Sequence, residues 1–169
     1  HLPGPDGVLD LTNISFTEKG DGMVEVRGSR FIPSSENTVK VEGVKRAGYH
    51  TVSIAGVRDP IMVRQIDAII KAINHKIDEF CGTEKINGRV SFKLYGKNGV
   101  MGALEPELAT DPNELGIVID ALGESQEAAD AVCAYARSSL LHYGYPNRLA
   151  TAGNLAFPFS PSDIPAEEV

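Results

Sequence analysis

The stretch DPIMVRQIDAIIKAINHKIDEFCG, residues 59–82, decides the fold. Its apolar side chains recur at steps of three and four residues, and this period predicts an α-helix with one apolar face. The members of this stripe are Met62, Ile66, Ile69, Ile73, Ile77 and Phe80. Asp59 is a favourable N-cap, Pro60 suits the first helical position, and Gly82 is expected to end the helix.

A second helix is predicted to begin after Ser125, another favourable N-cap residue. Its apolar stripe consists of Ala128, Val132, Tyr135 and Leu140. Gly144 is expected to end this helix. Several further alanines make the helix narrow, so it can pack closely against a sheet or another helix.

Short segments with strand patterns flank the two helices. The predicted strands are a hairpin around a turn at 19–22, and segments 38–44, 51–55, 89–95 and 115–122. The last segment is almost continuously apolar, which favours a strand buried on both faces. Strand pairs separated by helices predict an α+β fold. We expect a two-layer sandwich, with a mixed sheet, both amphipathic helices on one face and a C-terminal extended arm.

The predicted division of the chain is an α/β sandwich domain over 1–144 and an arm over 145–169. The arm is rich in Pro, Gly, Ser and Asn, and it holds Phe157 and Phe159 without a helix or strand pattern to bury them. Leaving such rings in water is unfavourable, so we expect the arm to be ordered and docked. The surface that receives the two rings is this domain, a missing domain or another subunit, for example across a homodimer interface.

Length and charge narrow the function classes. The chain has 169 residues, a formal net charge of −7 and a sequence pI near 5.1. An acidic chain without a clustered basic patch is a poor partner for nucleic acid. No apolar run is long enough to cross a bilayer, and the opening residues lack a signal peptide pattern, so we expect a cytoplasmic protein with no membrane partner. The first residue is His1 rather than Met, which suggests a processed product or an excised domain.

The sequence contains no complete catalytic motif, so the catalytic residues stay unknown. The histidines have no metal-ligand spacing, and we expect no metal site and no cofactor. Cys81 and Cys133 lie in predicted helices and are expected to be reduced core thiols. The candidate substrate-binding residues are Arg58, Lys97, Asn98 and Glu105.

Each candidate position also has a purely structural explanation. Arg58 precedes a helix N-terminus, which favours anions, but the Asp59 carboxylate competes by capping the same amides. Lys97 and Asn98 lie in a glycine-rich turn after a strand, where they either contact a ligand or simply form a wide turn.

Several segments resemble the AtuA (acyclic terpene utilisation) family. Val8–Glu18, Val24–Ser29 and Thr38–Val41 are similar to the opening of its C-terminal region, and Val90–Ala103 is similar to its strand and glycine turn. The resemblance implies the C-terminal part of a longer protein with an N-terminal α/β domain. It also implies a link to the catabolism of acyclic terpenes such as citronellol and geraniol, through acyl-CoA intermediates. It carries over no catalytic residue. The stretch after Gly56 departs from the alanine- and glycine-rich junction of many members, so no ligand at that junction is inferred.

These observations leave three functions open. The first is a C-terminal interaction or oligomerisation domain of an AtuA-like protein, whose partner is a second copy or a missing N-terminal domain. The alternative is an enzyme subunit that acts on an acyl-CoA or carboxylate intermediate, in a site completed by a missing N-terminal domain. The third is a stand-alone protein that binds a small molecule.

Overall fold

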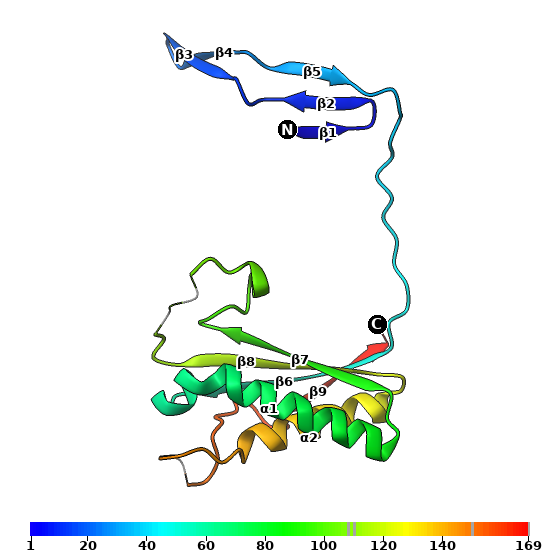
Figure 1. Cartoon of the computed structure of the whole chain (residues 1–169), viewed down its shortest axis with the longest axis vertical. Helices are drawn as coiled ribbons and strands as arrows, with labels where there is room; N and C mark the ends of the chain where they lie inside the picture. Colours follow the sequence, from blue (N-terminus) through cyan, green and yellow to red (C-terminus); the bar gives the residue numbers. More distant parts are fainter. Residues whose placement is uncertain (108, 110, 150, 169) are drawn as a thin grey trace. The chain divides into compact units, whose positions relative to one another are not determined.

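The computed structural model describes residues 1–107, 109, 111–149 and 151–168, and the chain separates into two compact units, 1–45 and 46–169 (Figure 1). This division differs from the expected one at residue 144 for two reasons. Residues 34–48 form an extended connection, and the end of the chain adds a strand to the main sheet. Ala150 and Val169 of the predicted arm lie outside the described residues.

The first unit consists of short antiparallel strands. β1 (Leu2–Gly4), β2 (Gly7–Asp10) and β5 (Arg30–Pro33) form one sheet, and β3 (Ser15–Gly20) pairs with β4 (Met23–Arg27). Asp21 and Gly22 adopt positive φ angles of 53° and 76° in the turn between β3 and β4. The hairpin predicted from the sequence is therefore confirmed.

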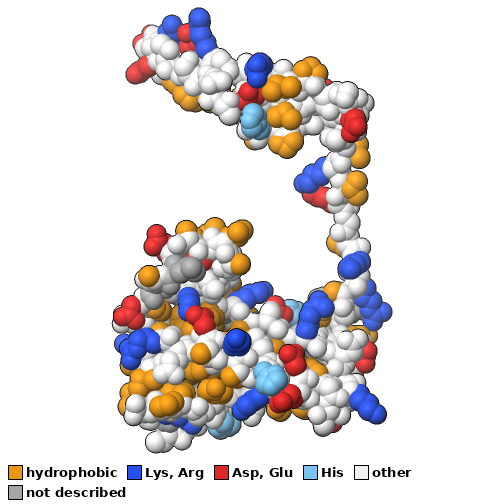
Figure 2. All heavy atoms as spheres, viewed as in Figure 1, with side chains coloured by type: hydrophobic (Ala, Val, Ile, Leu, Met, Phe, Trp, Pro, Cys, Tyr) orange, Lys and Arg blue, Asp and Glu red, His pale blue; other side chains and the backbone are white. Residues whose placement is uncertain are grey.

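No described apolar side chain of the first unit is fully buried. Asp10 is buried instead, and its carboxylate accepts hydrogen bonds from Thr12 and Arg30. Figure 2 shows hydrophobic side chains on the surface of this unit. A unit of this size without an apolar core has little hydrophobic stabilisation of its own.

The strand predicted over 38–44 does not form. No described strand covers this segment, and the side chains of Val39 and Val41 are 81% and 83% exposed. Alternating valines and polar residues suit a half-buried strand, but a strand also needs a neighbouring strand to pair with, and the pattern does not supply one. Residues 34–48 connect the two units, and none of them pairs with a described strand.

The second unit contains β6 (Tyr49–Val57), α1 (Pro60–Glu84), β7 (Gly88–Tyr95), η1 (Gly102–Leu104), β8 (Leu115–Gly123), α2 (Gln126–Leu141) and β9 (Asp163–Glu168). The sheet order is β7-β8-β6-β9, and both helices lie on one face (Figure 1). This β-α-β-β-α-β order is the ferredoxin-like arrangement. The predicted α+β sandwich with two helices on one face is confirmed.

The described sheet is wholly antiparallel, so the expectation of a mixed sheet is wrong. The physical reason is the position of β8. The crossover through α1 makes β6 and β7 parallel to each other, but β8 is inserted between them and pairs with both in the antiparallel sense.

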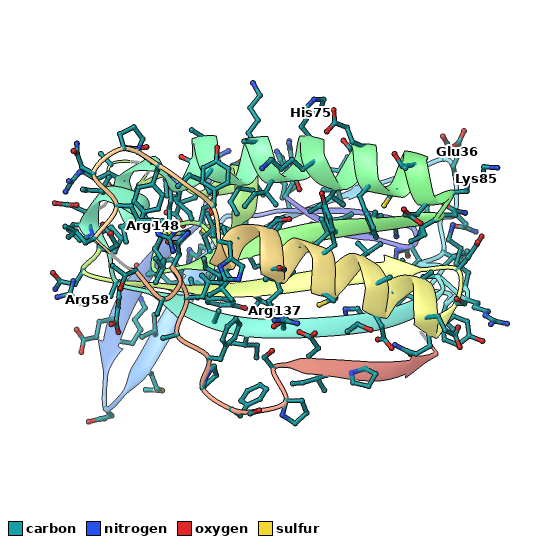
Figure 3. The ribbon with its side chains drawn as sticks, turned by 90° about the horizontal axis from the view of Figure 1, so that it is seen from below. Glu36, Arg58, His75, Lys85, Arg137 and Arg148 are labelled. Atoms are coloured by element: carbon teal, nitrogen blue, oxygen red, sulfur yellow. The ribbon has the colours of Figure 1, made fainter. Side chains whose placement is uncertain are left out.

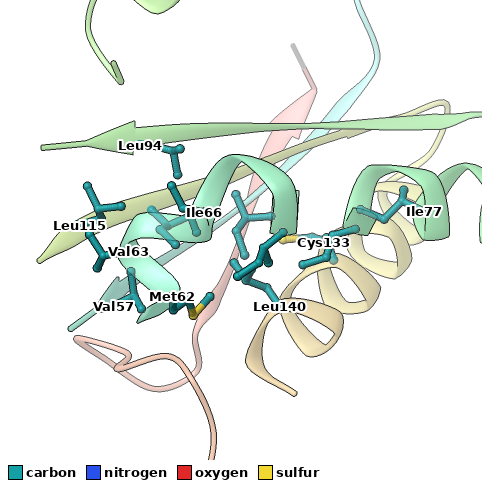
Figure 4. Close-up of a cluster of buried hydrophobic side chains, with 14 of the residues drawn as sticks. Val57, Met62, Val63, Ile66, Ile77, Leu94, Leu115, Cys133 and Leu140 are labelled. Atoms are coloured by element: carbon teal, nitrogen blue, oxygen red, sulfur yellow. The ribbon is translucent and has the colours of Figure 1, made fainter. Parts of the chain in front are cut away.

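The apolar stripe of α1 forms the core, as Figure 4 shows. The stripe shares one buried cluster with the inward side chains of β8, among them Ile117 and Ile119, which are fully buried. The helix continues two residues past Gly82. It ends at Lys85, whose left-handed backbone lets its amide bond the Cys81 carbonyl. Of the predicted stripe, Met62, Ile66, Ile69, Ile73 and Ile77 are buried, Phe80 is half-buried, and Val63 beside the stripe is also buried.

α2 packs beside α1 and is capped at its N-terminus. The Ser125 hydroxyl caps its first turn by accepting from the Ala128 amide at 3.2 Å, as predicted. In the middle, the ring of Tyr135 stacks on Phe80 of α1 with centroids 4.1 Å apart. The helix ends before His142, two residues earlier than the expected stop at Gly144. None of the helices among the described residues is long and apolar enough to cross a membrane.

The arm docks on its own unit. Asn154 donates to the carbonyls of Leu140 and Tyr143 at the end of α2, and Ala156 exchanges two backbone hydrogen bonds with Gly56 of β6. Further along, β9 pairs with β6 and includes Pro165, which an edge strand tolerates. The sequence predicted an extended arm without a helix or strand pair of its own, and the arm forms a strand because β6 offers an edge to pair with.

Arg137 of α2 holds the two parts of the arm together. Its Nε donates to Asp163 at 2.7 Å, and its guanidinium lies 5.9 Å from the centre of the Phe157 ring (Figure 3). Phe157 is half-buried, whereas Phe159 is 40% exposed. The sequence left three possible surfaces for the two Phe rings. The structure shows that Phe157 docks on the second unit itself.

Asp59 joins the start of α1 to the start of the arm. One carboxylate oxygen caps the helix by accepting from the Ile61 amide at 2.8 Å. The other accepts from the Tyr145 hydroxyl at 2.9 Å and the Leu149 amide at 3.3 Å. Burial acts to raise the pKa of Asp59, but these hydrogen bonds outweigh it and hold the pKa below its usual value. Burial and the Asp59 carboxylate together raise the pKa of Tyr145 to about 12.

Removing part of the α1 stripe should destabilise the second unit. Ile69→Ala deletes buried methyl groups between α1 and the sheet, and we expect a loss of about 2–5 kcal/mol. Urea denaturation followed by circular dichroism measures this loss. Lys71→Ala on the exposed face of the same helix is the control and should change stability by less than about 0.5 kcal/mol. Equal effects of the two substitutions would contradict the assignment of Ile69 to the core.

Removing the Asp59 carboxylate should release both the cap and the arm. Asp59→Ala is expected to cost about 1–3 kcal/mol, since it removes an N-cap and leaves the buried Tyr145 hydroxyl without its acceptor. The control is Asp78→Ala on the exposed side of α1.

Because the folded-state pKa of Asp59 is lowered, its stabilisation is present above its unfolded pKa near 3.9 and is lost as the pH falls through the folded value. The stability difference between wild type and Asp59→Ala should therefore shrink on acidification, and a difference independent of pH would contradict the assignment.

Candidate functional site

The second unit has a sheet face that its helices do not cover. Along β8, Leu115, Ile117 and Ile119 are buried under the helices, while the alternate side chains are only half-buried. The expectation that this strand is buried on both faces is wrong for this reason. We call the side opposite the helices the open face. Its side chains are His50, Val52, Ile54, Arg89, Ser91, Lys93, Tyr95, Val118, Asp120, Leu122 and Ile164.

The part of the open face on β7 and β8 is polar, and His50 at the start of β6 belongs to it. His50 Nε2 lies 2.5 Å from one oxygen of Asp120, and the Lys93 ammonium lies 3.2 Å from the other. An ionised carboxylate only accepts hydrogen bonds, so Nε2 is the protonated ring nitrogen. Burial raises the pKa of Asp120, but the hydrogen bonds from His50 and Lys93 outweigh it and leave the pKa below its usual value. Asp120 is thus a charged group that orients a histidine.

A cavity of about 510 Å3 opens beside this group. It is lined by Ala47, His50, Arg89, Val90, Ser91, Asp120 and Leu122. The volume lies in the range of small-molecule sites. Arg89 makes no ion pair with a described residue, so the cavity holds one cation whose charge is not balanced by a neighbour.

The β6–β9 side of the open face is apolar. Val52 and Ile164 are paired across the two strands, and Ile54 pairs with Val118 of β8. Ile54 and Ile164 are 36% and 44% exposed. The loop after β7 stands on the same side of the sheet (Figure 1), and its apolar side chains Val100, Met101 and Leu104 are also exposed.

Two of the predicted substrate-binding residues are engaged elsewhere in the unit. Arg58, at the end of the sheet where β6 ends, donates to the Asn113 carbonyl (Figure 3). Lys97 pairs with Asp67 of α1. The described contacts of these two cations do not join them to each other.

The other two predicted residues shape the loop after β7. The Asn98 amide donates to the Leu94 carbonyl, and its own carbonyl accepts from the Gly102 amide at 2.8 Å. Glu105 accepts from the Glu107 amide at 3.1 Å through its side chain. These contacts are those of a turn, and a role for Arg58, Lys97, Asn98 and Glu105 in substrate binding stays a prediction.

Neither cysteine has the environment of a nucleophile. Cys133 is fully buried, and burial raises its pKa to about 12. Burial also raises the pKa of Cys81, so both thiols are protonated at neutral pH. Among the residues that the structure describes, no group of three or more His, Cys, Asp or Glu side chains is placed to hold a metal ion.

Sequence reasoning missed the His50, Lys93 and Asp120 group. The available signal was Asp120 itself, a lone acid in the apolar run 115–122. A charge in such a position requires a partner. His50 and Lys93 come from other strands, and only the register of β6 and β7 against β8 brings them to Asp120.

Comparison with known proteins identifies the family. The family model for the acyclic terpene utilisation family protein AtuA matches residues 3–152. No curated protein and no solved structure gives a significant match. The match covers most of both units, including the hairpin, the connection at 34–48, and the β6 to α2 succession, and this chain belongs to the AtuA family of acyclic terpene utilisation.

Proposed function

We propose that this chain is an interaction domain that self-associates through the apolar half of its open sheet face. Its family links it to acyclic terpene utilisation, and the proposal concerns its part in that process. The observation that carries the proposal is the set of β-branched side chains on strands β6, β8 and β9, which no helix of the unit covers. Apolar patches on a sheet face are typical of surfaces that bind another protein.

The edges of the sheet favour association through the face. β7, at one edge, carries Arg89 and Lys93, and β9, at the other, carries Pro165. Charged side chains and proline are the usual means by which edge strands avoid pairing with another chain. Contact through the side chains of Val52, Ile54 and Ile164 uses the face of the sheet and not the free backbone of either edge strand, and it is self-complementary across a two-fold axis.

The first unit supports the same role. Phe16, Met23, Val24 and Phe31 are each at least half exposed, and the unit has no apolar core of its own. A segment of this composition gains stability when its apolar side chains are covered.

The enzymatic alternative has less support from the described contacts. It requires Arg58, Lys97, Asn98 and Glu105 to bind an acyl-CoA or carboxylate intermediate together. Arg58 and Lys97 are instead bound to a loop carbonyl and to a helix carboxylate of their own unit.

Introducing a charge at the centre of the apolar half should disrupt the association. The full chain, of 18.1 kDa, is expected to show about twice this mass by light scattering coupled to size exclusion. Ile54→Lys should reduce the mass to that of one chain, because a lysine buried in the contact is left without a partner. Circular dichroism checks that the variant is folded.

Val44→Lys is the matched control. It introduces the same charge at a fully exposed valine in the connection between the units, and should leave the mass unchanged. A wild-type chain that has the mass of a single copy at every concentration tested would contradict the proposal. So would an Ile54→Lys variant that keeps the wild-type mass.

A further inference from the structure

We propose that the cavity beside His50 binds a small aliphatic carboxylate, with Arg89 as the group that recognises the anion. This site lies on the polar side of the open face and is argued from one copy of the second unit. It uses none of the residues predicted from the sequence, and it is independent of self-association.

The charges around the cavity favour an anion. Asp120 has both carboxylate oxygens engaged, one by His50 and one by Lys93. Its charge is therefore already compensated inside the protein. Arg89 has no ion-pair partner among the described residues, so the cavity is locally positive in a chain whose net charge is −7. Glu124 lines an adjoining hollow together with Arg89, and the two make no ion pair.

The hydrogen-bonding groups favour a carboxylate in particular. A guanidinium presents paired N–H groups that match the two oxygens of a carboxylate. Ser91 adds a hydroxyl donor on the same strand, two residues from Arg89. His50 is held through Nε2 by Asp120, and its Nδ1 has no partner among the described residues. Nδ1 is a donor in the charged ring and an acceptor in the neutral ring. It can therefore donate to a carboxylate or accept from a protonated carboxylic acid.

The remaining walls favour an aliphatic chain. Ala47 and Leu122 contribute apolar side chains to the same cavity, and Val90, whose side chain packs against the core on the other face, borders it. A ligand that matches both the cation and the apolar walls has an acidic head and a short hydrocarbon tail. A volume of about 510 Å3 accommodates a molecule of this size with room for a larger substituent.

Binding to the full chain is measured by calorimetry with sodium hexanoate as the probe. Saturable binding is expected, and 1-hexanol, which lacks the charge, should not bind measurably. Inorganic phosphate, which lacks the chain, should bind more weakly than hexanoate. Phosphate binding as tight as that of hexanoate, or hexanol binding of equal strength, would overturn the proposal.

Two substitutions test the named residues. Arg89→Gln should weaken hexanoate binding roughly tenfold or more, which corresponds to about 1.4 kcal/mol. Arg64→Gln, on the exposed face of α1, is the matched control and should leave binding unchanged. His50→Gln should weaken binding by a smaller factor than Arg89→Gln.

Thermal melts confirm that each variant is folded before binding is compared. A folded Arg89→Gln chain that binds hexanoate as tightly as Arg64→Gln would overturn the assignment. So would the absence of saturable hexanoate binding to the wild-type chain.

Discussion

The burial of the α1 stripe and the inward side chains of β8 in one apolar core is the interaction on which the rest of the second unit depends. Ile66, Ile73 and Ile77 of the helix belong to the same cluster as Ile117 and Ile119 of the strand, and all five are almost completely buried. Each such side chain contributes roughly 1.5–3 kcal/mol when it leaves water. β6 and β7 pair on the two sides of β8, α2 packs across β8 and β6, and α1 packs beside α2. Asp59 caps the start of α1, and the arm pairs with β6 at the edge of this sheet.

The same packing also separates the two faces of the sheet. Side chains of successive residues in a strand point to opposite sides, so burying the odd-numbered residues of β8 directs Val118, Asp120 and Leu122 to the other side. Both helices are used on the inner side. The open face therefore follows from the ferredoxin-like arrangement, and its chemistry depends on which residues alternate with the core. In this chain they divide into an apolar half on β6 and β9 and a polar half towards β7.

These two halves suit different tasks. Val52, Ile54 and Ile164 offer a surface that a protein can cover, whereas His50, Arg89 and Asp120 surround a cavity with a positive charge. The proposed interaction role and the proposed carboxylate site thus occupy different parts of one sheet.

The sequence by itself determined the elements whose evidence is local. The period of the α1 stripe, the caps at Asp59 and Ser125, the hairpin turn and the strands around 51–55, 89–95 and 115–122 are all present in the structure. Each depends on residues near one another in the chain, so spacing and capping chemistry suffice. The resemblance of short segments to the AtuA family also came from the sequence, and the family match confirmed it.

Only the tertiary structure decided what depends on partners that are distant in sequence. The valines of 38–44 have a strand pattern but no pairing partner, while residues 163–168 have no strand pattern and become a strand because the edge of β6 is available. His50 and Asp120 are 70 residues apart, and the register between β6 and β8 brings them within 2.5 Å. Arg58 and Lys97 suggested a ligand site in the sequence. In the structure, Arg58 binds the Asn113 carbonyl and Lys97 binds Asp67, both within their own unit. In each case the contact joins residues distant in sequence, and the packing of whole elements decides whether they meet.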